Sequence, residues 1–485
     1  MQLLSKSWPK CRSCLDYIKN HKLIVGVTFI LFAISFYICF YQLGSGFFEN
    51  WDEGWYAEVV KQMLKNHNPI VLYWNGKVFL DKPPLNFWLD ALASIIFGLN
   101  EFSIRIVSAI SGFIVIGIVT IYSMRKWGIV PAIATFSAIA LNNIYIWRTR
   151  TGNLDALASL LIVLIFFVMI SKHPKRLLIL GILFGLTYLQ KASLVAYPIA
   201  IFALHEIFFQ WRYIKRNFIG YIICGALFAT IVGIWLYLGD QQIGSQFSEY
   251  YLYKADQGVA HIALKYFNTE YLWHLYYALQ RRMFYLFAIG VIFLGIGIRK
   301  RDNLTLVAFA LALVIQLTFT QRNNNWYLVP SMPFWALTVG CGTYGVMKLV
   351  KLIIRHKYTN VVIAVILLIP IIYVSYKTFS VNIDAIIKTR ASVSEVASAR
   401  KIKELSNSND VIMRLDHLYP VTIYYSGLTT QYHTTIDIGL YETIDKSNAR
   451  WVVGKSSQVK DFLSSYKDKP IKEIVLNDET IVQIK

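Results

Sequence analysis

The chain has 485 residues, of which 56% are hydrophobic and 16% charged, and its formal net charge at pH 7 is +20. Its mean hydropathy of +0.47 excludes an ordinary soluble protein, because so much apolar surface needs a lipid solvent. The basic residues lie mostly beside the ends of apolar segments, as membrane topology requires, so we expect no nucleic-acid partner.

Hydropathy predicts an all-α polytopic membrane protein with about eleven spanning helices, each near the length that crosses a ~30 Å hydrocarbon core. Basic residues at span ends favour one side, which places the amino terminus in the cytoplasm and the carboxyl terminus outside. We expect a cytoplasmic segment over 1–22 and a membrane domain over 23–379. The expected spans are 23–42, 104–123, 129–147, 154–170, 177–190, 193–210, 217–237, 283–298, 304–320, 328–347 and 360–378.

The first external loop, residues 43–103, is long and rich in aromatic and charged residues. Between Glu53 and Lys65 apolar residues recur at nearly helical spacing with Glu58 on the opposite side, which predicts a helix along the membrane interface. Asp52 stands where a helix N-cap belongs. Asn75-Gly76 predicts a turn before a second apolar stretch.

The last region, 380–485, is less apolar and more charged than the rest, which predicts a small external α/β domain. Short β-branched and aromatic runs predict its strands at 411–415, 421–425, 451–453, 474–476 and 481–484. Helical patterns cover 393–406 and 458–466.

Acidic and basic residues cluster at the external ends of the predicted spans. Asp52 and Asp155 come from separate loops, so a carboxylate there can accept a proton, or both can share a divalent cation. Lys82 and Lys191 can bind a phosphate as point charges. Structural explanations also exist: both acids can cap helices, Asp81 and Lys82 can form a solvated turn pair, and Lys191 can snorkel from a span end. The cluster as a whole suits a reaction on a lipid-borne substrate.

Three motifs in order carry a family resemblance. They are Asp52-Glu53-x-x-Tyr56-Ala57-Glu58, Asn75-Gly76-Lys77 and Lys82-Pro83-Pro84-Leu85. This set resembles the polytopic GT-C glycosyltransferases, and more narrowly the bacterial branch that contains lipid A aminoarabinose transferase and relatives of protein O-mannosyltransferases. Further matches are Arg105, Arg150 through Asp155, Leu189-Gln190-Lys191 and Asn325-Trp326-Tyr327-Leu328-Val329-Pro330.

The resemblance implies transfer of a monosaccharide from a polyprenyl-phosphate donor to an acceptor at the outer face of the inner membrane, with inversion at the anomeric carbon. The implied catalytic residues are Asp52, Glu53 and Asp155, with Asp52 and Asp155 as the candidate ligands of a divalent metal (Mg, Mn or Zn). The implied donor-phosphate ligands are Lys82, Arg150 and Lys191. The implied substrate pocket consists of Trp55, Tyr56, Asp81, Arg105, Trp326 and Tyr327.

Two departures from the aminoarabinose branch leave the sugar open, since Trp55 stands where the branch tends to have Arg and Asp81 where it tends to have Glu. The expected acceptor is lipid A or another envelope glycan, with a protein acceptor as the alternative. A lipid or glycan transporter and a non-catalytic envelope-assembly protein are the rival classes. The oligomeric state is left open.

Overall fold

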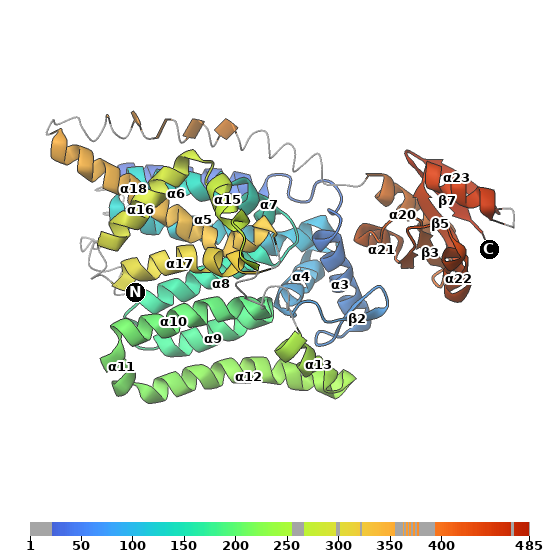
Figure 1. Cartoon of the computed structure of the whole chain (residues 1–485), viewed down its shortest axis with the longest axis horizontal. Coiled ribbons are helices and arrows are strands. Elements are labelled where there is room, and N and C mark those ends of the chain that lie inside the picture. Colours follow the sequence, from blue (N-terminus) through green and yellow to red (C-terminus); the bar gives the residue numbers. More distant parts are fainter. Residues whose placement is uncertain are drawn as a thin grey trace.

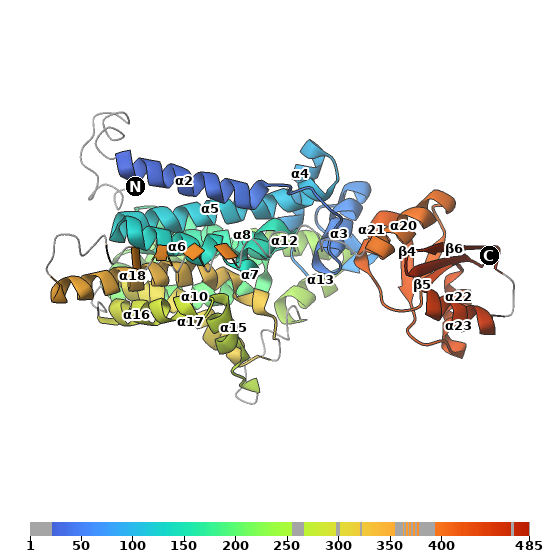
Figure 2. The same cartoon turned by 90° about the horizontal axis from the view of Figure 1, so that it is seen from above.

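The computed structural model describes residues 22–254, 266–296, 301–320, 323–354, 393–466 and 470–484, with a few single residues between 362 and 377. Figures 1 and 2 show an elongated molecule in which a helical bundle lies at one end and a small α/β domain at the other. The segment that contains α3 and α4 lies between these two parts.

Within the described residues, six helical segments are long and apolar enough to cross a membrane. They are α2 (Lys22–Phe40), α5 (Glu101–Trp127), η2 with α10 (Ala192–Val195 and Ala196–Phe209), α12 (Phe218–Ile243), α17 (Arg301–Thr318) and η5 with α18 (Asn325–Ser331 and Met332–Ile353). Two bent pairs raise the number to eight if each counts as one span. They are α6 (Ile129–Ala140) with α7 (Asn143–Arg150), and α15 (Glu270–Ala278) with α16 (Arg282–Ile296).

The expected number of eleven spans is not confirmed. Two further expected spans correspond to α8 (Asp155–Ile170) and α9 (Arg176–Gln190), which have 16 and 15 residues and are short for a full crossing. Of the expected span over 360–378 only scattered positions between 362 and 377 are described, and these are helical. Three short helical segments, α11 (Trp211–Arg216), α13 (Gln246–Glu249) and the π-turn η3 (Tyr250–Lys254), follow the ends of α10 and α12.

The first loop contains α3 (Asp52–Asn66), a hairpin of β1 (Leu72–Trp74) and β2 (Lys77–Phe79), and α4 (Leu85–Phe97). The predicted helix and the predicted Asn75-Gly76 turn are both confirmed, and both turn residues have the positive φ that such a two-residue hairpin requires. The predicted N-cap is wrong, because Trp51 holds that position and Asp52 is the first residue inside the helix.

The C-terminal domain has a five-stranded sheet in the order β4-β3-β5-β7-β6, in which β3 runs parallel to β4 and β5 while β7 runs antiparallel to β5 and β6. Its elements are α20 (Val393–Leu405), β3 (Val411–Arg414), α21 (Pro420–Ser426), β4 (Thr429–Tyr432), α22 (Ile438–Ser447), β5 (Ala449–Lys455), α23 (Ser456–Ser465), β6 (Lys472–Leu476) and β7 (Glu479–Gln483).

Four of the five predicted strands and both predicted helices are present in this domain, but 421–425 is a helix rather than a strand. Pro420 occupies the first turn and Gly427 ends the helix in the left-handed region, at φ 73°. These two residues specify a short helix in spite of the β-branched and aromatic residues between them.

The C-terminal domain is joined to the first loop by specific hydrogen bonds. The Tyr425 hydroxyl accepts from the Phe48 amide at 3.0 Å and donates to Glu101 at 2.6 Å. Asn75 exchanges two hydrogen bonds with the backbone of Thr430, at 2.7 and 2.9 Å. Burial and the nearby Glu101 carboxylate raise the pKa of Tyr425, so this hydroxyl stays protonated and keeps its donor.

Helix α21 of the C-terminal domain packs along α3. A Cβ atom on Gly54 would lie 2.8 Å from the side chain of Val421, so glycine is needed for this close approach. Further along α3, Lys61 Nζ donates to the Tyr424 carbonyl at 2.7 Å and to Glu58 at 3.1 Å. The prediction that Glu58 faces away from the packed side is therefore wrong, because its side chain is buried beside this contact.

A candidate active site at the end of the bundle

Four charged side chains from four elements form one ion-pair network. Arg148 Nη2 lies 2.9 Å from Asp52 Oδ2 and 2.7 Å from Asp155 Oδ2, and Arg148 Nε donates to the same Asp155 oxygen at 2.8 Å. Lys191 Nζ lies 3.3 Å from the other oxygen of Asp155. The Asp155 side chain is 3% exposed, whereas that of Asp52 is 34% exposed. Asp52 is thus the acid of this pair that a ligand can reach.

Local backbone structure positions each member of the network. Asp52 begins α3, and Asp155 begins α8 with its amide bonded to the Asn153 side chain at 2.8 Å. Arg148 lies in the last turn of α7, a helix capped by Asn142. Lys191 lies at the break between α9 and η2, where its extended backbone conformation ends α9.

Aromatic rings surround the two cations of the network. Lys191 Nζ lies 4.7 Å from the centre of the Tyr327 ring, and the Arg148 guanidinium lies 5.7 Å from Trp326 and 5.0 Å from Trp147. Cation–π contacts of this kind stabilise a partly desolvated charge without neutralising it. The structure therefore brings the predicted pocket residues Trp326 and Tyr327 to the same site as Asp155 and Lys191.

The Asp81-Lys82 pair sits in the loop before α4. Lys82 Nζ lies 2.8 Å from Asp81, and their side chains are 17% and 41% exposed. The hydroxyl of Tyr251, in the segment after α12, donates to the Lys82 carbonyl at 3.0 Å and fixes this loop. Burial raises the pKa of Tyr56, and the charges of Asp52 and Asp81 raise it further. The Tyr56 hydroxyl therefore keeps its proton at neutral pH.

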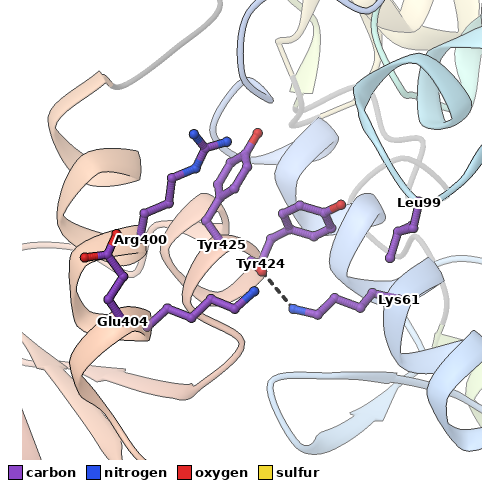
Figure 3. Close-up of a pocket in the computed structure, with 7 residues that line it drawn as sticks. Lys61, Leu99, Arg400, Glu404, Tyr424 and Tyr425 are labelled. Atoms are coloured by element: carbon purple, nitrogen blue, oxygen red, sulfur yellow. Dashed lines mark hydrogen bonds between the residues drawn. The ribbon is translucent and has the colours of Figure 1, made fainter.

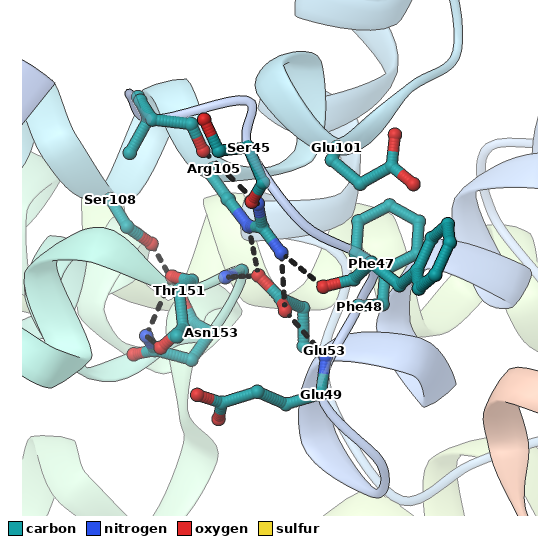
Figure 4. A network of polar contacts seen from close by, with 12 residues as sticks. Ser45, Phe47, Phe48, Glu49, Glu53, Glu101, Arg105, Ser108, Thr151 and Asn153 are labelled. Carbon is teal, nitrogen blue, oxygen red and sulfur yellow. Dashed lines mark hydrogen bonds and ion pairs between the residues drawn. The ribbon is translucent and has the colours of Figure 1, made fainter. Parts of the chain in front are cut away.

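Glu53 has a different environment from its neighbour Asp52. Its carboxylate lies 2.7 and 3.0 Å from Arg105 in a two-pronged ion pair, and both side chains are buried (Figure 4). It also accepts from the amides of Gly152 and Glu49, at 2.9 and 2.8 Å. With four donors on two oxygens, Glu53 ties α3 to α5 and to the turn before α8. This geometry gives it no lone pair directed at a substrate.

The two buried arginines of the predicted site, Arg105 and Arg150, donate their hydrogen bonds to groups of the protein itself. Arg105 donates to the carbonyls of Leu43, Ser45 and Phe47 in addition to Glu53. Arg150 donates to the carbonyls of Ile38 and Tyr41, each at 2.6 Å, at the end of α2. The structure thus places Arg105 and Arg150 as ties between helices and the first loop, not beside the Asp52 network as expected.

Trp55 packs against the hairpin of the first loop. Its ring lies 5.2 Å from Trp74 and 5.5 Å from Phe79, and its indole nitrogen is buried with no hydrogen-bond partner among the described residues. It contributes to the apolar cluster beneath the Lys82 loop.

The arrangement of Asp52 and Asp155 does not fit a divalent cation. The guanidinium of Arg148 already bridges the two carboxylates that would have to hold the metal. Within the described ranges, no group of three or more His, Cys, Asp or Glu side chains comes together to hold a metal ion.

Sequence reasoning missed Arg148 as a site residue. Arg148 and Arg150 are two residues apart on α7 and point in different directions, one to the acids and one to α2. Composition gives no reason to prefer either. The Asn142 cap marks where α7 begins, but no signal in the sequence says which of the two arginines faces the acids. Trp147 and Glu49, joined at 3.0 Å, extend the network and were also missed.

Comparison with known proteins supports the resemblance found in the sequence. A family model described as dolichyl-phosphate-mannose-protein mannosyltransferase matches residues 81–237. The crystal structure of ArnT from Cupriavidus metallidurans in the apo state has a TM-score of 0.71 at 14% identity, covering 94% of this chain and 98% of that one. The same protein bound to undecaprenyl phosphate gives 0.68, with 96% and 98% covered.

Sequence comparison narrows the relationship. The chain is 28% identical over 200 residues to an undecaprenyl phosphate-alpha-4-amino-4-deoxy-L-arabinose arabinosyl transferase of Wigglesworthia glossinidia brevipalpis, a match of 38% of this chain and 35% of the relative. It thus spans about a third of the length of the curated relatives it matches. The chain therefore shares its fold with ArnT, resembles the aminoarabinose transferases in sequence over part of its length, and has the apolar helices of a multi-pass membrane protein.

Proposed function

We propose that the protein is a glycosyltransferase that moves a monosaccharide from a polyprenyl-phosphate donor to lipid A or another envelope glycan. The observation that carries the proposal is the Asp52–Arg148–Asp155–Lys191 network, which pairs a reachable carboxylate with cations suited to a phosphate. The fold shared with a protein crystallised with undecaprenyl phosphate supports the donor class. Lipid A as the acceptor is supported by the relationship to the aminoarabinose transferases.

The chemistry follows from the competition for cations. The donor phosphate binds Lys82 and Lys191 and competes with Asp52 for Arg148, because a phosphate is a stronger acceptor for a guanidinium than a carboxylate that is one-third exposed. Asp52 is then free to accept the proton of the attacking acceptor oxygen. That oxygen bonds to the anomeric carbon as the carbon–oxygen bond to the phosphate breaks, and the sugar inverts. The leaving polyprenyl phosphate keeps the bond electrons, and the lysines stabilise its charge.

Asp155 acts in this scheme as a positioning residue. It is buried and paired with both Arg148 and Lys191, so it holds the two cations at the distance a phosphate needs. Glu53 and Arg105 hold α3 in place and take no part in the bond changes. No step passes through a metal ion, in keeping with the Arg148 bridge between the two acids.

We further propose that the amino terminus is cytoplasmic and the C-terminal domain external, which puts this site at the outer face. The distribution of basic residues supports this orientation. A protein acceptor is the second candidate, favoured by the description of the matching family model. A transporter is less favoured, because transporters hold their ionisable residues near the bilayer midplane. Here Asp52 and Asp155 begin α3 and α8, and Arg148 and Lys191 lie at the ends of α7 and α9.

The test is mass spectrometry of envelope lipids and glycoproteins from cells that lack the protein, complemented with wild type, Asp52→Asn or Asp461→Asn. The last variant makes the same chemical change on the exposed face of α23. We expect wild type and Asp461→Asn to restore one sugar mass, and Asp52→Asn to restore about 10²–10⁴ less. Identical lipids and glycoproteins in all strains would reject a glycosyltransferase.

A further inference from the structure

Two cavities lie beside α3, and none of the residues that line them belongs to the ion-pair network. One is a basic pocket of about 650 Å³ lined by Lys61, Leu99, Arg400, Lys403, Glu404, Tyr424 and Tyr425. The other is an apolar groove of about 440 Å³ between α3 and α4, lined by Met63, Leu64, His67, Pro69, Trp88, Ala91, Leu92 and Ile95. Nothing in the proposed reaction uses either of them.

The charge of the basic pocket comes from both sides of the domain junction. Figure 3 shows Lys61 and Leu99 on the loop side and Arg400 and Glu404 on the side of the C-terminal domain. Glu404 is neutralised by Lys401 at 2.7 Å, and Lys61 by Glu58. Arg400 stacks on the rings of Phe47 and Tyr425, at 4.6 and 5.2 Å. In the described part of the chain neither Arg400 nor Lys403 forms an ion pair.

Stacking holds the Arg400 guanidinium in place without using its N–H donors, so the donors are available to an anion. Lys403 follows on the same helix, three residues later, and lines the same cavity. The pocket therefore offers two unpaired cations with aromatic walls, which is the chemistry that recognises a phosphate or carboxylate.

The groove and the pocket share the same two elements. On α3, Lys61 lines the pocket, and Leu64, one turn later, lines the groove. On the other side Leu92 and Ile95 of α4 line the groove, and Leu99, just after the helix, lines the pocket. A single elongated ligand can therefore occupy both cavities.

The surface beside the groove is strongly apolar. Leu92, Ile95, Ile96 and Phe97 are 54%, 70%, 64% and 52% exposed. Exposed large apolar side chains in a row on a membrane protein are suited to lipid chains. The occupant that fits an apolar groove ending in a basic pocket is thus an amphiphile with an anionic headgroup.

We propose that the groove and the basic pocket bind the acceptor of the transfer reaction, an anionic glycolipid, with its chain between α3 and α4 and an anionic group between Arg400 and Lys403. This inference rests on the proposed function. Helix α3 carries Asp52 at its start and Lys61 nine residues later, about 14 Å away along the axis and about half a turn round it. A sugar headgroup can bridge that distance to the reacting carboxylate, whereas the small headgroup of an ordinary phospholipid cannot.

The first test is binding of purified lipid A and of phosphatidylglycerol to the full-length protein in detergent, followed by native mass spectrometry. The variants are Arg400→Gln with Lys403→Gln, and Ile95→Ser in the groove, with Lys446→Gln on exposed α22 as the matched control. We expect the double variant to bind lipid A about tenfold or more weakly, since each lost hydrogen bond to a charged group is worth about tenfold or more. Ile95→Ser, which removes apolar contact alone, should weaken binding less. The control should bind as wild type does.

The second test is steady-state transfer by the same variants. The double variant should raise the KM for lipid A while leaving kcat and the donor KM near wild type, because neither residue touches the donor site. Equal affinity for phosphatidylglycerol, lost equally in the double variant, would mean an ordinary phospholipid site and overturn the inference. Unchanged lipid A binding in the double variant would also overturn it.

Failure of the proposed function gives a different result from failure of this inference. A wild-type protein that transfers no sugar to lipid A, yet binds it through Arg400 and Lys403, would refute the acceptor role and the reaction together. A protein that transfers sugar normally but binds lipid A independently of these residues would refute the inference alone.

Discussion

Asp52 and Glu53, the two adjacent acids at the start of α3, are expected to differ when each is replaced by its amide: one change should lower activity and the other stability. Glu53→Gln removes one charge of a buried two-pronged pair with Arg105, while Asp52→Asn removes a charge that is one-third exposed. We expect Glu53→Gln to lower stability strongly and Asp52→Asn to lower activity strongly. Both changes keep the size of the side chain, so the contrast isolates the charge.

The magnitude for Glu53 follows from its four hydrogen bonds, at 2.7, 3.0, 2.9 and 2.8 Å. An amide can accept only at its oxygen, so its NH₂ group must face donors from Arg105 or the Glu49 amide. Breaking a buried ion pair from one side costs about 3–5 kcal/mol. The Asp52 carboxylate is one-third exposed, so its pair with Arg148 contributes less, about 1 kcal/mol, and its loss leaves Arg148 paired with Asp155.

The assay is a thermal unfolding scan of the purified protein in detergent, combined with transfer kinetics below the unfolding range. Glu53→Gln should lower the unfolding midpoint by several degrees, with kcat near wild type in the fraction that is folded. Asp52→Asn should keep the midpoint and lose about 10²–10⁴ in rate. A Glu53→Gln protein with normal stability and low kcat would show that Glu53 acts in the chemistry, and our structural assignment would be wrong.

Three further predictions address helix packing, domain contact and the donor phosphate. Gly112→Ala should lower stability by about 1–3 kcal/mol and reduce activity, because the new Cβ would overlap Thr149 on α7, the helix that carries Arg148. Gly225→Ala is the control: a Cβ there would have no neighbouring atom within 4 Å, so the same thermal scans should show no change. Tyr425→Phe should cost about 1–3 kcal/mol by leaving a buried amide unpaired, and limited proteolysis should then release the C-terminal domain faster than in wild type. Lys191→Met should raise the donor KM at least tenfold, and its stability loss should be small because Asp155, the buried partner of Lys191, stays paired with Arg148. An unchanged donor KM would show that Lys191 does not bind the donor phosphate.

The sequence predicted the elements whose signals are local. The helix from 53 to 65 and the Asn75-Gly76 hairpin follow from periodicity and from the backbone freedom of Asn and Gly, and both are present. The family motifs also indicated the residues that meet at the end of the bundle, Asp52, Asp155 and Lys191. Asp52 lies more than a hundred positions before the other two, so resemblance rather than spacing carried that prediction.

What the sequence could not decide was which charges serve the fold. Glu53 and Asp52 are neighbours of similar chemistry, yet the phase of α3 directs one into the core and the other to the site. Arg148 and Arg150 differ in the same way on α7. Such choices depend on tertiary packing of helices whose relative rotation no local pattern specifies.

The close packing of α21 on α3 has a mechanical consequence. Val421 touches α3 at Gly54, two residues from Asp52, and Tyr424 holds Lys61 about two turns further on. Because α3 is held at both contacts, it moves as a rigid body. A tilt of 5° about the Lys61 contact would displace Asp52, ~14 Å away, by about 1 Å. Misplacement by that amount can cost about a hundredfold in rate. The C-terminal domain, far from α3 in sequence, thus determines how precisely the Asp52 carboxylate is aligned.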